Sequence, residues 1–199
     1  MKQYTITQFK DWQSVPIVNI NNVFKLQAEG VSASAQIAYE KDNILVHLFA
    51  KEKDIRKEEN DVLGMPCYDS CLEFFFCPNP EEDRYFNIEF NSNACVFFGF
   101  SGGADSIMRQ IPENDILDFF KPKIAKNEDN WEIYYEIPFT LIRRYFPNFN
   151  VYDGKAIRAN CFKCSDNSTP PHYLSWNLVE GEPFTFHKPE YFGTMKFVR

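Results

Sequence analysis

Two strand-like segments carry polar groups that alternate with large apolar side chains. Glu73 lies within Cys71–Cys77 (CLEFFFC), and Asn87 and Glu89 lie within Tyr85–Asn91 (YFNIEFN). Because successive side chains of a strand point to opposite faces, these polar groups would share one face of a sheet. Carboxylates and amides there could hydrogen-bond to sugar hydroxyls, and aromatic rings could stack on sugar C–H faces. A solvated polar face is the ordinary structural alternative.

Glu73 and Glu89 could instead form the carboxyl pair of a glycoside hydrolase. Hydrolysis needs two carboxyl groups about 5–10 Å apart, one of them with a raised pKa, and neighbouring strands could supply that distance. A purely structural role is also open for Glu73, because a buried carboxylate must be paired with a partner. The hydrolase hypothesis predicts turnover of chromogenic glycosides that Glu73→Gln abolishes.

The cysteine, histidine and glycine patterns do not predict a metal, redox or nucleotide site. Cys161–Cys164 (CFKC) has the spacing of redox and zinc motifs, but the chain has no second CxxC and no HxxxH. We therefore expect the six cysteines to be mostly buried free thiols. We expect His172 and His187 to be hydrogen-bonded structural residues. Gly102-Gly103 lacks the spacing of a nucleotide-binding loop.

The elements that must position these groups are short strands with period-two alternation. Such strands, at spacings of about 8–12 residues, predict an all-β, antiparallel β-sandwich. Residues 138–146 (PFTLIRRYF) have helical apolar spacing, with proline in the first turn, and predict one short helix. The charged segment 51–60 is expected to be an exposed loop. The predicted strands are 33–39, 44–50, 71–77, 85–91, 94–100, 131–137, 156–164, which includes Asn160, and 194–198.

Composition limits the possible partners. The chain has 199 residues, 44% hydrophobic and 17% aromatic, and its 28 acidic against 21 basic side chains give a net charge of -7. We expect a single domain over residues 1–199. The acidic balance argues against nucleic acid, and no apolar run reaches the roughly 18 residues that span a membrane. The first residues lack a signal peptide, which predicts a cytoplasmic protein, or a secreted one if a leader was removed.

Six motifs occur in an order that is typical of one known family. Together they resemble the carbohydrate-binding modules of family 9, in particular the stand-alone bacterial branch, from about Trp12 to the last strand. The motifs are 68–76 (YDSCLEFFF), 85–91 (YFNIEFN), 131–138 (WEIYYEIP), 158–164 (RANCFKC), 171–177 (PHYLSWN) and 187–193 (HKPEYFG).

The resemblance implies a jelly-roll-like sandwich that binds a mono- or oligosaccharide without cleaving it, in carbohydrate catabolism. Trp176 resembles one of the two tryptophans that hold the sugar in this family, with Asn177 beside it. Glu73 resembles the family's acidic contact, and Arg109 its arginine. The other tryptophan would fall near Cys67, where this chain has no large ring. That departure keeps open a protein-interaction module on a retained sugar-binding fold.

The resemblance also implies structural calcium, although the sequence contains no EF-hand loop. Aspartates in predicted turns could supply oxygen ligands to the ion. The sequence leaves the identity of the metal ligands and the oligomeric state open. These aspartates are Asp42, Asp61, Asp83, Asp105 and Asp153.

Overall fold

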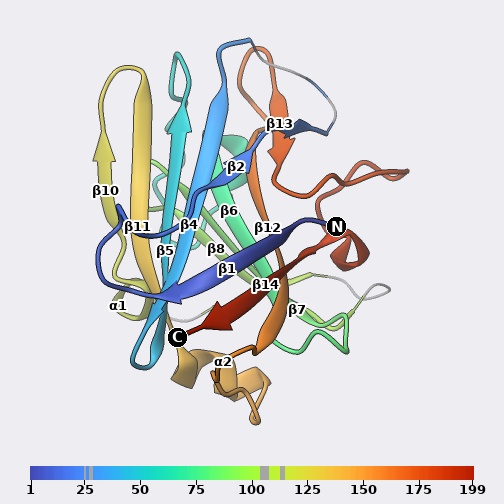
Figure 1. Cartoon of the computed structure of the whole chain (residues 1–199). Helices are drawn as coiled ribbons and strands as arrows, with labels where there is room; N and C mark the ends of the chain where they lie inside the picture. The colour runs from blue at the N-terminus through green and yellow to red at the C-terminus, as the bar shows by residue number, and fades with distance from the viewer. Residues whose placement is uncertain (25, 27–28, 104–107, 113–114) are drawn as a thin grey trace.

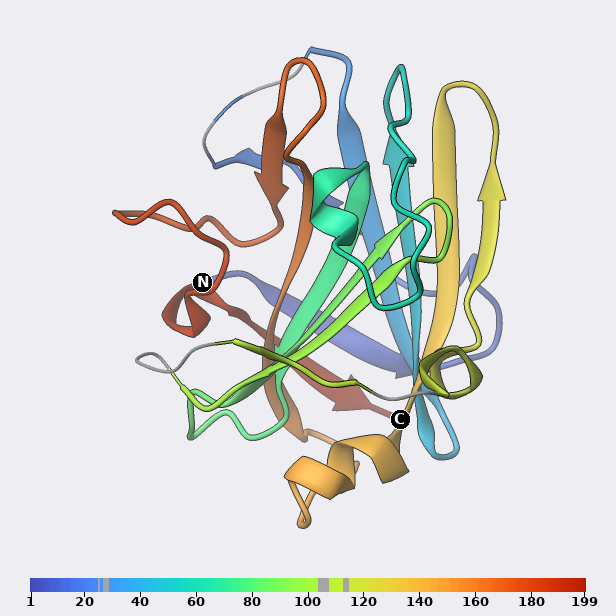
Figure 2. The same cartoon turned by 180° about the vertical axis from the view of Figure 1, so that it is seen from behind.

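The computed structural model describes residues 1–24, 26, 29–103, 108–112 and 115–199. In this part of the chain, fourteen strands form one hydrogen-bonded sheet that curls into two layers (Figures 1 and 2). The strands are β1 (Gln3–Gln8), β2 (Val18–Ile20), β3 (Asn22–Val23), β4 (Ser32–Glu40), β5 (Asn43–Lys51), β6 (Cys71–Cys77), β7 (Tyr85–Asn91), β8 (Val96–Ser101), β9 (Arg109–Gln110), β10 (Lys123–Lys126), β11 (Asn130–Pro138), β12 (Ala156–Ser165), β13 (His172–Ser175) and β14 (Gly193–Val198). The helices are α1 (Ile116–Phe120) and α2 (Phe139–Tyr145), with 3₁₀ turns η1 (Pro66–Tyr68) and η2 (Pro189–Tyr191).

The strand order explains how two layers arise from one sheet. It runs β10-β11-β5-β4-β1-β14-β12-β6-β7-β8-β9, with β2, β3 and β13 pairing off this path. The predicted all-β sandwich is confirmed, and the pairs are antiparallel except those of β1. This strand runs parallel to both β4 and β14, and its inward side chains Tyr4 and Ile6 are buried. The alternation in residues 3–8 is too short to predict a strand or its direction.

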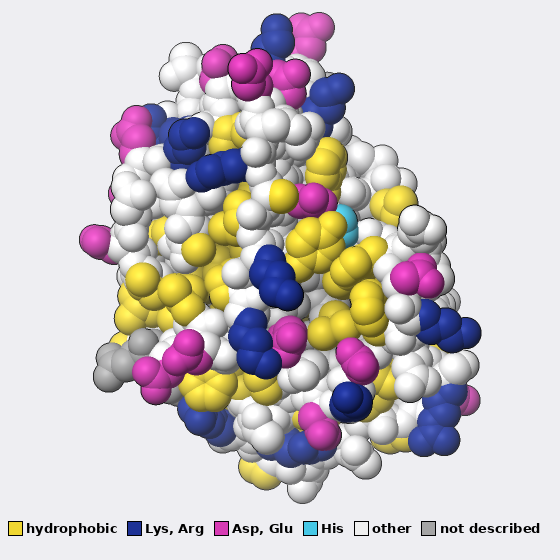
Figure 3. Space-filling model, turned by 90° about the vertical axis from the view of Figure 1, so that its left-hand side faces the viewer, with side chains coloured by type: hydrophobic (Ala, Val, Ile, Leu, Met, Phe, Trp, Pro, Cys, Tyr) yellow, Lys and Arg dark blue, Asp and Glu magenta, His cyan; other side chains and the backbone are white. Residues whose placement is uncertain are grey.

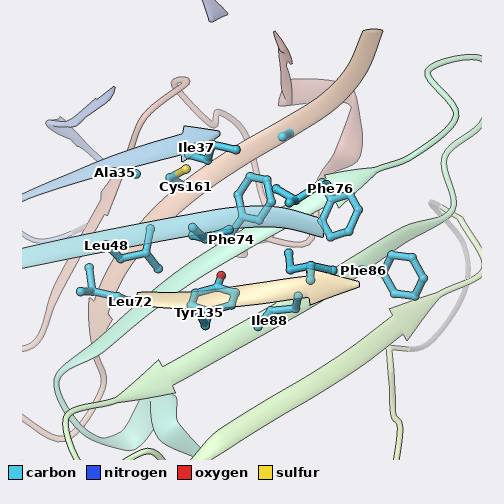
Figure 4. Packing of buried hydrophobic residues seen from close by; sticks show 14 of the residues in the cluster. Ala35, Ile37, Leu48, Leu72, Phe74, Phe76, Phe86, Ile88, Tyr135 and Cys161 are labelled. Atoms are coloured by element: carbon cyan, nitrogen blue, oxygen red, sulfur yellow. The ribbon is translucent and has the colours of Figure 1, made fainter. Parts of the chain in front are cut away.

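The main hydrophobic core lies between the two layers. Inward side chains of β4, β5 and β11 meet those of β6, β7 and β12, and Figure 4 shows Ile37 and Leu48 opposite Phe74, Phe76 and Ile88 on the facing strands. In each strand the side chains that enter this core are every second residue, although β6 and β7 are buried on both faces. The core therefore fixes which side chains of β6 and β7 must point outward.

A second apolar cluster covers the outer face of β6 and β12. Phe75 and Phe162 point away from the main core and pack under the loop that leads to β14, which contributes Val179, Phe186 and Phe192. Phe162 and Phe186 stack with ring centroids 4.2 Å apart. This loop is held on the sheet by burying rings that would otherwise face water.

The prediction of an exposed loop over residues 51–60 needs correction. The segment expected to be an exposed loop, residues 51–60, contains Glu52, which is buried and pairs with Lys163 at 3.1 Å. His172 lies 2.9 Å from the Lys163 ammonium, so the expected structural role of this histidine fits a buried polar network. Because a charged run gives no sign of a distant lysine, the sequence pattern could not place Glu52.

The helices and cysteines also differ in detail from the expectation. The predicted helix over 138–146 is present as α2, and the structure adds α1, which is too short to give a clear periodic signal. All six cysteines are free, and only Cys67 is partly exposed. Cys161 and Cys164 lie on opposite faces of β12, in separate clusters, so their CxxC spacing forms no site.

Two features of the surface bear on partners. Within the described residues, no helix is long and apolar enough to cross a membrane. On the face drawn in Figure 3, lysine and arginine side chains are interspersed with aspartate and glutamate rather than gathered into one region.

Candidate functional site

A pocket of about 440 Å³ opens on the outer face of β6, β7 and β12, on the side of the molecule that Figure 2 shows. It lies where the apolar cover of this face ends, between η1 and the loop before β14. Its volume is within the range of small-ligand sites. The described lining residues are Phe24, Met65, Cys67, Glu73, Asn87, Glu89, Phe97, Met108, Cys164, Asp166, Tyr173, Phe184, Thr185, Phe186 and His187.

The polar floor of the pocket comes from two paired strands. Glu73 on β6 lies directly opposite Glu89 on β7 in the antiparallel register. Cys164 donates its thiol hydrogen to Oε1 of Glu73 over 2.9 Å, and Asn87 donates Nδ2 to Oε1 of Glu89 over 2.7 Å. Among the described residues, Oδ1 of Asn87 and Oε2 of Glu89 have no hydrogen-bond partner, although both side chains are buried. Buried acceptors left without donors are costly, and they commonly mark a ligand site.

The electrostatics of this floor favour protonated carboxyl groups. Burial, and then the neighbouring Glu89 carboxylate, raise the pKa of Glu73 well above its ordinary value. Burial also raises the pKa of Glu89 to about 7, with a further contribution from Asp166, while the amide of Asn87 opposes the rise. Two facing carboxylates in a poorly hydrated site cannot both ionise freely. The two groups therefore titrate together, and the pKa of each lies above that of an ordinary glutamate.

Aromatic rings form one wall of the pocket. Phe24 packs edge-on against Phe184 at 5.7 Å and tilted against Phe186 at 5.3 Å between ring centroids. Tyr173 contacts the same Phe186 ring. Phe184 is half exposed and lines the pocket. The wall thus offers apolar ring surface beside the polar floor.

A glycine allows the opposite wall to approach closely. A Cβ atom at Gly99 on β8 would lie 2.6 Å from the sulfur of Met108 and 2.6 Å from the Phe97 ring. Both of these side chains line the pocket. Any larger residue at this position would force Met108 or Phe97 to move.

The structure brings together three of the residues that the sequence singled out. Glu73, Asn87 and Glu89 share the pocket floor, as the alternation of β6 and β7 predicts. Cys67, at the position where the family resemblance leads one to look for a tryptophan, lines the same pocket. The polar face of the sheet is therefore a concave site and not simply a solvated surface.

The other predicted contacts lie elsewhere. Trp176 is 5% exposed in the main core, where its ring packs edge-on against Tyr4. Asn160 and Asn177 hold each other through two 2.9 Å hydrogen bonds between side chain and backbone. Arg109 is exposed on the edge strand β9, next to the lining residue Met108. None of these four predicted residues lines the described pocket.

The calcium that the resemblance implies stays a prediction, and the one cluster of potential metal ligands found among the described residues is of another kind. Among the described residues, one group of three potential ligands lies within 4.8 Å, and it consists of Cys71, Glu73 and Cys164. Two thiols and one carboxyl suit a thiol-seeking ion such as zinc, whereas calcium requires several oxygen ligands. Asp105 lies outside the described residues, and the other four turn aspartates belong to no such group.

The sequence did not predict that residues from distant loops line the pocket. Phe24, Phe184, Phe186 and His187 reach the pocket from segments far apart in the chain. The alternation of Phe184 and Phe186 was a weak signal of a half-buried extended segment. His187, expected to be structural, does bond to Tyr85 at 2.9 Å, and it also lines the pocket.

Comparison with known proteins places this geometry in a family. The model of carbohydrate-binding family 9 matches residues 6–197, which is nearly the whole chain. The chain belongs to carbohydrate-binding family 9. A search of curated proteins finds no match to this family 9 chain.

Solved structures share the same sandwich. A protein from Bacteroides uniformis, provisionally assigned as carbohydrate-binding, is 24% identical, with a TM-score of 0.81 over 98% of this chain and 99% of its own. A family 9 module from Caldicellulosiruptor kristjanssonii in complex with cellotriose is 10% identical, with a TM-score of 0.70 over 99% of this chain and 94% of its own. The glucose complex from the same organism is 12% identical, with a TM-score of 0.70 over 100% and 97%. At these identities the structures establish the fold that this family 9 chain shares with them.

Proposed function

We propose that this chain is a non-catalytic module that binds a mono- or oligosaccharide end in the pocket on β6, β7 and β12. The observation that carries the proposal is the pair of partnerless acceptors, Oδ1 of Asn87 and Oε2 of Glu89, at the floor of a ring-walled pocket. Membership of carbohydrate-binding family 9, and the sugar complexes of the Caldicellulosiruptor module, support the same ligand class.

Each part of the pocket has a role in this proposal. Sugar hydroxyls donate hydrogen bonds to Asn87 and Glu89, which satisfies both buried acceptors. Glu73, when protonated, donates to or accepts from a further hydroxyl. The C–H face of the sugar stacks on Phe184, a ring that replaces the tryptophan stacking expected from the resemblance. Trp176, Asn160, Asn177 and Arg109 have no contact role here.

The test is a thermal-shift screen with mono- and disaccharides, with and without calcium. A ligand that binds only the folded state raises the melting temperature as its concentration increases. We expect such a rise for the intact chain and its loss in Asn87→Ala, with Asn19→Ala as an exposed control on β2. Circular dichroism checks that both variants fold. No shift with any sugar, in a folded protein, would overturn the proposal and favour the protein-interaction module.

One observation also favours a hydrolase, namely the raised pKa of the facing carboxyls Glu73 and Glu89. A general acid in a glycosidase needs a carboxyl that is protonated near neutral pH. In this structure both groups belong to one floor, formed by adjacent strands. We expect no release of reducing ends from oligosaccharides or chromogenic glycosides. Turnover that Glu73→Gln abolishes would establish the enzyme instead.

A further inference from the structure

The described lining of the pocket is acidic. Glu73, Glu89 and Asp166 line it, and none of the described lining residues is a lysine or an arginine. The buried Lys163 lies on the other face of β12, where it pairs with Glu52 at 3.1 Å. The charge of Lys163 is therefore already matched inside the protein. A ligand must bring the positive charge if the floor is to be neutralised without protonation.

The hydrogen-bonding needs of the floor point in the same direction. Both partnerless atoms, Oδ1 of Asn87 and Oε2 of the ionised Glu89, are acceptors. Two donors on the floor are already used, because the Cys164 thiol bonds to Glu73 and the Asn87 amide bonds to Glu89. A hydroxyl offers one donor, whereas an ammonium offers three donors and no acceptor. An ammonium thus carries enough donors for both atoms and adds a charge-assisted bond.

The walls are compatible with a cation as well as with a sugar ring. Phe24, Tyr173 and Phe184 present aromatic surface beside the acidic floor. The negative face of an aromatic ring attracts a cation within about 6 Å, and it also packs against C–H groups. An aminated sugar presents both features, a charged group and an apolar C–H face.

We propose that the pocket selects a sugar with a free, protonated amino group, seated between Glu89 and Asn87. This inference rests on the proposed function, since it names the class of sugar that the pocket takes. N-acetylation would remove the positive charge, leave one N–H donor and add bulk. The neutral parent sugar would keep the ring contacts but lose the charge-assisted bonds.

The test is isothermal titration calorimetry on the intact chain at about pH 7 and constant ionic strength. Glucosamine, galactosamine and mannosamine are each compared with the neutral parent hexose and with the N-acetyl form. We expect at least one amino sugar to bind at least tenfold more tightly than its parent and its N-acetyl form. In Glu89→Gln we expect this ratio to fall toward one, and in the exposed control Glu40→Gln to persist.

The outcomes separate the two proposals. Binding of neutral sugars with no preference for the amino forms would overturn this inference and leave the proposed function standing. Absence of binding by all the sugars, in a protein that unfolds cooperatively, would overturn both. A preference that survives in Glu89→Gln would also overturn the inference, because the seat of the ammonium would be elsewhere.

Discussion

Replacing Glu89 with glutamine should make the protein more stable at neutral and higher pH, and by an amount that depends on pH. Glu89 is buried on the pocket floor, opposite Glu73. Glutamine has nearly the same shape and no charge. The variant therefore removes the cost of ionising a buried carboxyl while it keeps the packing of β7.

The size of the effect follows from the shift of the Glu89 pKa. Its pKa rises from 4.5 in the unfolded chain to about 7 in the folded one. Since one pKa unit corresponds to about 1.4 kcal/mol, ionisation of Glu89 costs about 3 kcal/mol of folding free energy. Between these two pKa values the folded state binds more protons than the unfolded state. The intact chain therefore has its full stability below about pH 4.5 and loses about 3 kcal/mol of it as the pH rises through 7.

The assay is urea unfolding followed by tryptophan fluorescence, at several pH values from about 4.5 to 8.5. We expect the variant and the intact chain to differ by a constant at the acidic end, and by about 3 kcal/mol more at the alkaline end. Glu40→Gln, at the exposed end of β4, should follow the intact chain throughout. If the unfolding free energies of Glu89→Gln and of the intact chain depend on pH in the same way, the Glu89 pKa is not raised by burial in the pocket floor.

Three further substitutions test other parts of the structure. Burial alone would raise the pKa of Glu52, but Lys163 and the hydrogen bonds around Glu52 outweigh this effect and lower the pKa to about 2. The intact chain should therefore lose stability as the pH falls from about 5 to 2, and Glu52→Gln should abolish this dependence in urea unfolding. A variant that loses stability with acid like the intact chain would contradict this prediction. Trp176→Ala should cost about 3–5 kcal/mol in urea unfolding, as expected for a core ring, and a cost below about 1 kcal/mol would contradict core packing. Phe184→Ala should weaken sugar binding about tenfold in calorimetry, which corresponds to the loss of about 1.4 kcal/mol of stacking. The exposed control Tyr152→Ala should leave the affinity unchanged. Equal effects of the two substitutions would exclude stacking on Phe184.

Much of the fold and the pocket floor could be predicted from local alternation. In β6 and β7 a period of two separates Phe74 and Ile88, which face the core, from Glu73 and Glu89, which face outward. The signal is strong because one face of each strand is continuously apolar and must be buried. Pairing of these two strands then brings the carboxyls together without further information.

The pocket walls could not be predicted, because they depend on contacts between distant segments. Nothing near Phe184 in the sequence indicates that its loop folds back over β12 to meet Phe24. Trp176 follows Leu174 at strand spacing, and this pattern alone cannot say which face of the strand is buried. The resemblance favoured a ligand contact for Trp176, whereas packing against Tyr4 places it in the core.

The partners of buried polar and charged residues could not be predicted from local sequence patterns either. Glu52 looks like part of a solvated loop, and only the fold brings it to Lys163 at 3.1 Å. Asn160 lies on the outward face as the alternation predicts, but the loop around Asn177 covers it. In both cases the partner is supplied by tertiary structure rather than by neighbours in the sequence.

The most direct test of the central claim is a crystal structure of this chain with the best sugar ligand from the screen. We expect the sugar in the pocket on β6, β7 and β12, with its donors within about 3 Å of Oδ1 of Asn87 and Oε2 of Glu89. We also expect one face of the sugar to lie against Phe184. A sugar bound at another surface, with these two acceptors still unpartnered, would show that the pocket is not the binding site.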